Sequence, residues 1–170
     1  MSIGLLIVRL AVGLTLAAHG SQKLFGWFGG GGISGTAPIL ESLGFRPGRV
    51  SAAMAGIAEF GGGLFLALGL LTPLAASVLV GVMIVAIVSV HWANGFFLMK
   101  SGYEYAFVLG AAAAGLAFTG PGALSADEAL GLPWPTAAPV AALVLGVLAA
   151  AVQLSARRTA PVVAAQGIGQ

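Results

Sequence analysis

The sequence has no cysteine among its 170 residues, which excludes disulfide bonds, dithiol chemistry and iron–sulfur clusters held by thiolates of this chain. Charge is also scarce: Asp, Glu, Lys and Arg make up only 7% of the residues, whereas a soluble domain carries about 25%. The seven basic residues are scattered and form no stripe of the kind that binds nucleic acid. A soluble domain and a nucleic-acid partner are therefore both disfavoured.

Apolar residues dominate instead. They make up 59% of the chain, the mean hydropathy is +1.04, and the 27 glycines suit close packing of helices in lipid. Each apolar run is close to the ~20 residues that a helix needs to cross a bilayer. This pattern predicts an all-α fold, a polytopic membrane helical bundle whose spans are 3–19, 51–71, 73–94, 103–119 and 137–154.

The basic residues predict the orientation of this bundle. If all five runs span, one membrane face receives every basic residue except Arg9, and the other receives the amino terminus with Asp127 and Glu128. Basic loops stay cytoplasmic, so the chain should cross the cell membrane several times with its N-terminus outside and its C-terminus in the cytoplasm. In a four-span alternative the last run lies on the surface, which would move Arg157 and Arg158 outside against this rule. The six residues on the inner face are Lys23, Arg46, Arg49, Lys100, Arg157 and Arg158.

The connection between the first two spans is the least regular part of the sequence. Four glycines at 29–32 disfavour a helix, because glycine costs about 1 kcal/mol per residue there. A short amphipathic helix is expected over 38–43, lying on the inner surface.

Two charged residues lie deep within the predicted spans. Arg9 is roughly 9 Å from the outer end of the first span and Glu59 roughly 12 Å from the inner end of the second. Charges in a bilayer are costly without a partner, so the simplest expectation is a structural ion pair between Arg9 and Glu59. That pair could serve only to dock two helices, or Glu59 could be a protonatable group in a ligand cavity.

Further polar residues approach the same inner leaflet. His19 and Lys23 end the first span, His91 lies near the end of the third, and Glu104 begins the fourth. We expect these residues and Glu59 to form one ligand-binding or proton-handling cavity, although a single histidine there would more often be an ordinary interfacial residue. Both histidines lie near the rim, which disfavours haem, and the spacing of His and Glu predicts no metal site. No catalytic residue can be assigned.

Several motifs occur in a fixed order along the chain. They are His19-Gly20-Ser21-Gln22-Lys23-Leu24-Phe25-Gly26, Ala58-Glu59-Phe60-Gly61-Gly62-Gly63, His91-Trp92-Ala93-Asn94-Gly95 and Gly102-Tyr103-Glu104-Tyr105. With these motifs the sequence resembles the DoxX family of small bacterial integral membrane proteins over about residues 3–125. The resemblance implies a DoxX-like four-helix core over 1–125. The outer loop with a fifth C-terminal transmembrane helix over 126–158 departs from the family as an added span, and the tail over 159–170, which has no charge and little pattern, is expected to be disordered.

The resemblance also implies a class of function. Relatives are associated with quinone-linked sulfur oxidation, and others with membrane complexes that handle thiols and oxidative stress. The leading hypothesis is a redox-associated subunit that binds a quinone or other lipophilic small molecule within the bundle. The alternatives are a non-enzymatic anchor or scaffold and a small-solute transporter, so enzyme activity stays open. Expected partners are the lipid bilayer and membrane or cytoplasmic redox proteins, with homo-oligomerisation also open.

Overall fold

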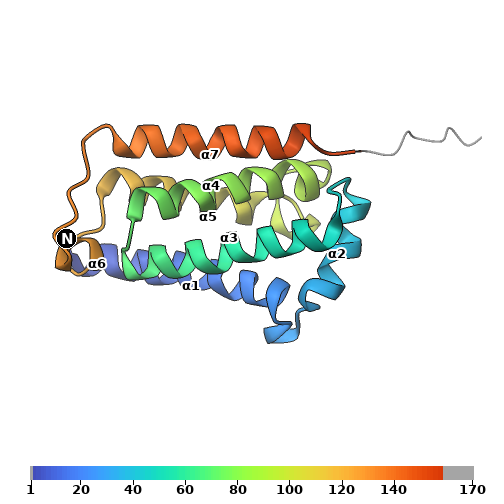
Figure 1. Cartoon of the computed structure of the whole chain (residues 1–170), viewed down its shortest axis with the longest axis horizontal. Helices are drawn as coiled ribbons and strands as arrows, with labels where there is room; N and C mark the ends of the chain where they lie inside the picture. The colour runs from blue at the N-terminus through green and yellow to red at the C-terminus, as the bar shows by residue number, and fades with distance from the viewer. Residues whose placement is uncertain (1, 159–170) are drawn as a thin grey trace, which may run out of the picture.

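The computed structural model describes residues 2–158, and over this range the chain is a bundle of long antiparallel helices with no strand (Figure 1). The predicted tail over 159–170 lies outside the described residues. The all-α polytopic bundle predicted from the sequence is confirmed. Four of its helices are long and apolar enough to cross a membrane. The long helices are α1 (Ser2–Leu24), α3 (Gly48–Leu68), α4 (Thr72–Ala86), α5 (Glu104–Thr119) and α7 (Ala138–Ser155).

Glycine and proline set the ends of these helices. α3 begins directly after Pro47 and ends at Gly69, whose φ of 63° only glycine adopts without strain. α4 then carries Pro73 in its first turn, where a missing N–H costs nothing. Beyond Ala86 the helix first widens into η2 (Ile87–His91), a π-helical turn, and then tightens into η3 (Trp92–Asn94), a 3-10 turn. α5 has 16 residues, roughly 24 Å, and does not continue into a π or 3-10 turn as α4 does.

Short helices cover the two ends of the bundle. At one end lie η1 (Trp27–Gly29), α2 (Gly32–Ser42) and η4 (Leu98–Lys100); at the other lies α6 (Ala126–Ala129). Figure 1 shows α6 beside the N-terminus and α2 at the far end. α2 is longer than the predicted helix over 38–43 and starts at the last glycine of the tetrad. It packs on α3, where Ala37 lies against Gly48, and this packing outweighs the low helix propensity of glycine.

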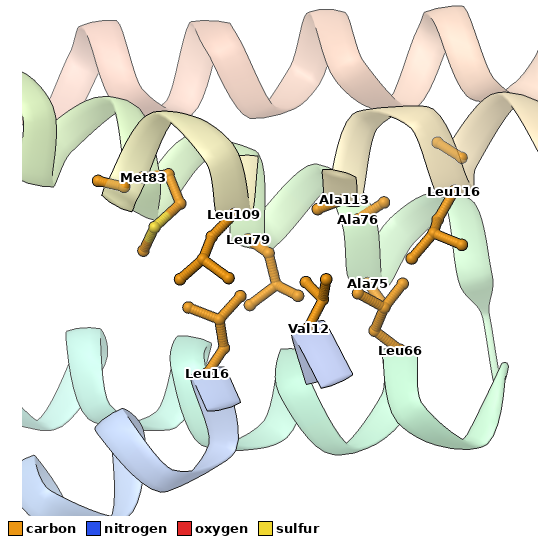
Figure 2. Packing of buried hydrophobic residues seen from close by; sticks show 12 residues of the cluster. Val12, Leu16, Leu66, Ala75, Ala76, Leu79, Met83, Leu109, Ala113 and Leu116 are labelled. Atoms are coloured by element: carbon orange, nitrogen blue, oxygen red, sulfur yellow. The ribbon is translucent and has the colours of Figure 1, made fainter. Parts of the chain in front are cut away.

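The hydrophobic core lies where α1, α3, α4 and α5 meet (Figure 2). Leu16 of α1, Leu79 of α4 and Leu109 of α5 are buried there at its centre. α7 packs mainly along α4. Large apolar side chains are exposed on every long helix, including Ile57 and Phe107, as expected of a surface that faces acyl chains. The protein is therefore a multi-pass membrane protein.

Candidate functional site

Glycines bring α1 and α3 into direct backbone contact. Gly13 and Gly20 on α1 are seven residues apart, as are Gly56 and Gly63 on α3, so each pair shares a helix face. A Cβ atom on Gly20 would lie 2.3 Å from the Phe60 nitrogen, a distance that no side chain tolerates. The two helices are thus locked in one register, and that register decides which polar residues meet.

In this register Glu59 faces Lys23. The Lys23 ammonium forms an ion pair and hydrogen bond with Glu59 Oε2. The Glu59 side chain is only 6% exposed and that of Lys23 is 28% exposed, so the carboxylate is buried while the ammonium reaches towards the interface. The pair lies at the C-terminal end of α1, which we call the inner end after the orientation predicted from the charges.

The expected structural ion pair between Arg9 and Glu59 is not formed. Arg9 lies level with Gly69, ten residues beyond Glu59 on α3, because a Cβ on Gly69 would touch its guanidinium. Ten residues are roughly 15 Å along a helix, too far for the two side chains to meet. The error came from the depth estimate, which treated the first span as ending at His19, whereas α1 continues for another turn to Leu24.

Arg9 instead belongs to a buried polar network at the opposite end of the bundle, which we call the outer end after the same predicted orientation. Its two terminal amino groups donate hydrogen bonds to the carbonyl oxygens of Pro121 and Leu124. Asp127, 1% exposed, accepts from the backbone N–H groups of Leu71 and Thr72 at 2.7 and 3.0 Å, and from the Thr72 hydroxyl at 2.7 Å. The Asp127 carboxylate thereby caps the start of α4 and holds the outer loop against it.

The sequence predicts Asp127 only as part of an acidic outer loop and not as a helix cap. A signal was present: Ser125 and Glu128 have the spacing of a helix-capping box. In the structure Ser125 Oγ accepts from the Glu128 N–H at 3.2 Å and starts α6. The Trp134 indole completes the network by donating to Asp127 at 3.1 Å.

His19 lies one turn before Lys23 on α1 and contacts α5. Its Nε2 is 3.3 Å from the hydroxyl of Tyr105, and the two rings meet edge to face with centroids 5.8 Å apart. His19 is partly buried and Tyr105 is 41% exposed, so the pair opens towards the lipid side of the bundle. The sequence does not single out Tyr105 as a site residue, because a tyrosine at the start of a membrane helix is typical of an interfacial anchor.

We call His19, Tyr105, Lys23 and Glu59 the inner polar cluster. Three helices contribute to it: α1 supplies two residues one turn apart, α3 supplies Glu59 and α5 supplies Tyr105. Each of the four side chains can carry or exchange a proton. The cluster therefore combines an imidazole–phenol pair near lipid with an ion pair one turn further along α1.

His91 and Glu104 bind a neighbouring loop instead. His91 Nδ1 lies 2.8 Å from the Ser101 carbonyl oxygen, which can only accept, so Nδ1 carries the proton. The Glu104 carboxylate accepts from the Leu98 N–H at 2.9 Å. Both residues shape the 95–103 loop, and among the described residues no hydrogen bond connects them to the inner polar cluster. The single cavity shared by His19, Glu59, His91 and Glu104 stays a prediction.

The sequence model of the DoxX family matches residues 4–92. The chain belongs to the DoxX family. The matched region runs from α1 to the end of the π-helical turn and contains His19, Lys23, Glu59 and His91, whereas α5 and α7 follow it. Searches of curated proteins and of solved structures found no match.

A separate apolar groove of about 390 Å³ lies between α3, α4 and α7 of this DoxX protein. Ala55 and Ala58 of α3, Val82 of α4 and Ala149 of α7 are among its lining residues. Glu59 does not line this groove, and its carboxylate pairs with Lys23 of α1, so the groove and the inner polar cluster are different places.

The Lys23–Glu59 pair leads to a stability prediction. We expect Glu59→Ala to lower the free energy of unfolding by about 2–3 kcal/mol, since it leaves a partly buried ammonium without its partner. In a double-mutant cycle with Lys23→Met, the two changes should couple by about 1–3 kcal/mol. The matched cycle with Arg9→Met should be additive within about 0.5 kcal/mol. Denaturation of the detergent-solubilised variants measures both; coupling to Arg9 alone would contradict the ion pair.

Proposed function

We propose that this DoxX protein is a redox-associated subunit of the cytoplasmic membrane that binds the head group of a quinone-like molecule at the inner polar cluster. The observation that carries the proposal is the contact of the His19 imidazole with the Tyr105 hydroxyl on a lipid-facing surface, backed by a buried ion pair one turn away. Ionisable side chains that face the bilayer interior are energetically costly, and where they occur they usually serve a function.

The chemistry of the cluster suits a quinone. A quinone oxygen accepts a hydrogen bond and the corresponding quinol hydroxyl donates one. Neutral imidazole and a phenol hydroxyl can each do both, so the His19–Tyr105 pair can serve either redox form. A lipophilic ligand would reach them laterally from the membrane, where Phe107 and Val108 are exposed beside Tyr105.

Conversion of a quinone to a quinol takes up two protons and two electrons. We assign to this chain the binding of the head group and the proton exchange, with Lys23–Glu59 as the proton-holding pair. The two electrons are supplied or taken up by a partner redox protein, in line with the expected membrane or cytoplasmic redox partners.

Two tyrosine variants test this function. We expect Tyr105→Phe, which removes one hydroxyl, to weaken binding of a short-chain ubiquinone or menaquinone analogue about tenfold in nanodiscs, as loss of one hydrogen bond of roughly 1.4 kcal/mol would. His19→Ala should weaken it at least as much without unfolding the protein. Tyr103→Phe is the matched control, because the Tyr103 ring stacks on Trp92 at 5.4 Å, away from His19. Equal binding by Tyr105→Phe and wild type would overturn the proposal.

A scaffold is the second candidate, and one observation favours it. Glu59, His91 and Glu104 all have partners within the protein, as residues that only orient a bundle would. A scaffold predicts that none of these variants alters quinone binding, and that no quinone co-purifies with the solubilised protein.

The proposed orientation rests on the distribution of charge. Arg158 donates its N–H to the Gly44 carbonyl at 2.9 Å, so the end of α7 meets the connection that holds Arg46 and Arg49. We expect a reporter fused after Arg158 to be cytoplasmic, and one inserted beside Glu128, which is exposed, to be periplasmic. A cytoplasmic signal at Glu128 would contradict the proposed threading.

A further inference from the structure

The apolar groove between α3, α4 and α7 ends in a charged mouth. Phe45 lines its inner end, and the Arg157 guanidinium carbon lies 5.4 Å from the centroid of that ring. Arg157 Nε donates to the Leu43 carbonyl at 2.9 Å, which fixes the head of the side chain there. The two terminal amino groups of Arg157 make no hydrogen bond among the described residues. Their N–H groups can therefore donate to a ligand at the mouth of the groove.

Polarity along the groove changes from one end to the other. The middle is lined by small or branched apolar side chains such as Val82 and Ala149. Ser51 and Gln153 lie at the inner end, and neither side chain has a hydrogen-bond partner among the described residues. Gln153 lies in the last turn of α7, and Arg157 follows two residues after that helix ends at Ser155. A ligand that fits is apolar in one part and polar or anionic at its inner tip.

The length of the groove matches one membrane leaflet. On α4 the lining runs from Ser77 to Val85, roughly 12 Å along the helix, against about 15 Å for half of the hydrocarbon core. Its volume of about 390 Å³ is within the usual range for a ligand pocket. A single acyl chain in the inner leaflet would follow this path and bring its head group to Arg157.

The charges around the mouth favour an anion. Arg46, Arg49 and Arg158 lie in the segments that meet there, and the only acid in those segments is Glu41, whose carboxylate accepts the Gly48 N–H at 2.9 Å. Basic pockets between helices at the cytoplasmic side bind anionic lipid head groups. We infer that the α3–α4–α7 groove is a binding site for an anionic phospholipid, with one acyl chain in the groove and the phosphate at Arg157.

Native mass spectrometry of the full chain tests this site. The protein would be released from nanodiscs that contain equal amounts of phosphatidylglycerol and phosphatidylcholine, and the retained lipid identified by mass. We expect one phosphatidylglycerol to be retained in preference to phosphatidylcholine. Arg157→Gln should lower that preference about fivefold, the loss expected for one basic residue near an anionic head group. Arg46→Gln removes the same charge from a residue for which no stacking on the Phe45 ring is found among the described residues, and it should change the preference less.

A second pair of variants tests occupancy of the groove itself. Ala149→Phe should fill the groove and abolish retention of lipid, because Ala149 is an exposed lining residue that has space for a larger side chain. Val147→Phe is its matched control, since Val147 is exposed on α7 and does not line the groove. Equal retention of both lipids by wild type would overturn the inference, and so would full competition by free glycerol phosphate. It would also be overturned if the groove held a quinone, a second copy of the chain or residues 159–170 of the chain itself.

Discussion

Gly63→Ala should lower the free energy of unfolding by about 3 kcal/mol, at the upper end of the usual cost of overpacking. The added methyl group would lie 2.5 Å from the Ala17 nitrogen and the Gly13 carbonyl oxygen, both backbone atoms of α1. Backbone cannot move aside as a flexible side chain can, so α1 and α3 must separate. Because the Lys23–Glu59 contact depends on that packing, the same change should also weaken ligand binding at the inner polar cluster.

Gly61→Ala is the matched control on the same helix. No atom lies within 4 Å of the position where a Cβ on Gly61 would stand. Replacing glycine by alanine in a helix then adds up to about 1 kcal/mol of stability, so the same chemical change should have the opposite sign two residues away. Chemical denaturation in detergent measures both variants. Equal effects at the two positions would contradict the close α1–α3 contact.

Asp127→Ala should destabilise the protein by about 3–5 kcal/mol, because two backbone N–H groups and one hydroxyl at the start of α4 would lose their acceptor in a buried place. Asp127→Asn keeps one acceptor oxygen but turns an amino group towards these donors, so its effect should be intermediate. The loop that receives Arg9 should loosen in both variants, which hydrogen exchange of residues 120–130 can follow.

Glu128→Ala is the control for the acidic pair. Glu128 neighbours Asp127 in sequence and carries the same charge, but its side chain is exposed. Its replacement should change the unfolding free energy by no more than about 0.5 kcal/mol. A similar loss for both residues would show that general charge at the outer end, rather than the cap on α4, accounts for the effect.

The sequence predicted the helices better than the contacts between them. Apolar runs bounded by glycine and proline predicted five segments whose ends lie within five residues of those in α1, α3, α5 and α7, and of the continuous stretch from α4 to η3. Which face of each helix meets protein was not predictable, because lipid and protein interiors are both apolar and hydrophobic periodicity barely separates them. The partner of Glu59 depended on register, which the backbone contacts at Gly13, Gly20 and Gly63 set.

The candidate site was predicted in part for the same reason. Intramembrane charge singled out His19, Lys23 and Glu59, and the structure places these three residues near one another on α1 and α3. Tyr105 carries no charge at neutral pH and so had no such signal. Asp127 and Arg9 were predicted to lie at one end of the bundle, and the structure places them together there, but their partners are loop carbonyls and helix N–H groups that only the folded chain brings together.

Photolabelling tests the proposed quinone site most directly. The wild-type protein in nanodiscs would be irradiated with a quinone analogue that carries a photoreactive group on its ring, and the modified residues mapped by peptide mass spectrometry. We expect labels next to His19 on α1 and next to Tyr105 on α5, reduced in Tyr105→Phe and unchanged in Tyr103→Phe. Labelling confined to residues 145–153 of α7, or no more labelling than with a photoreactive alkane of equal length, would contradict a quinone site at the inner polar cluster.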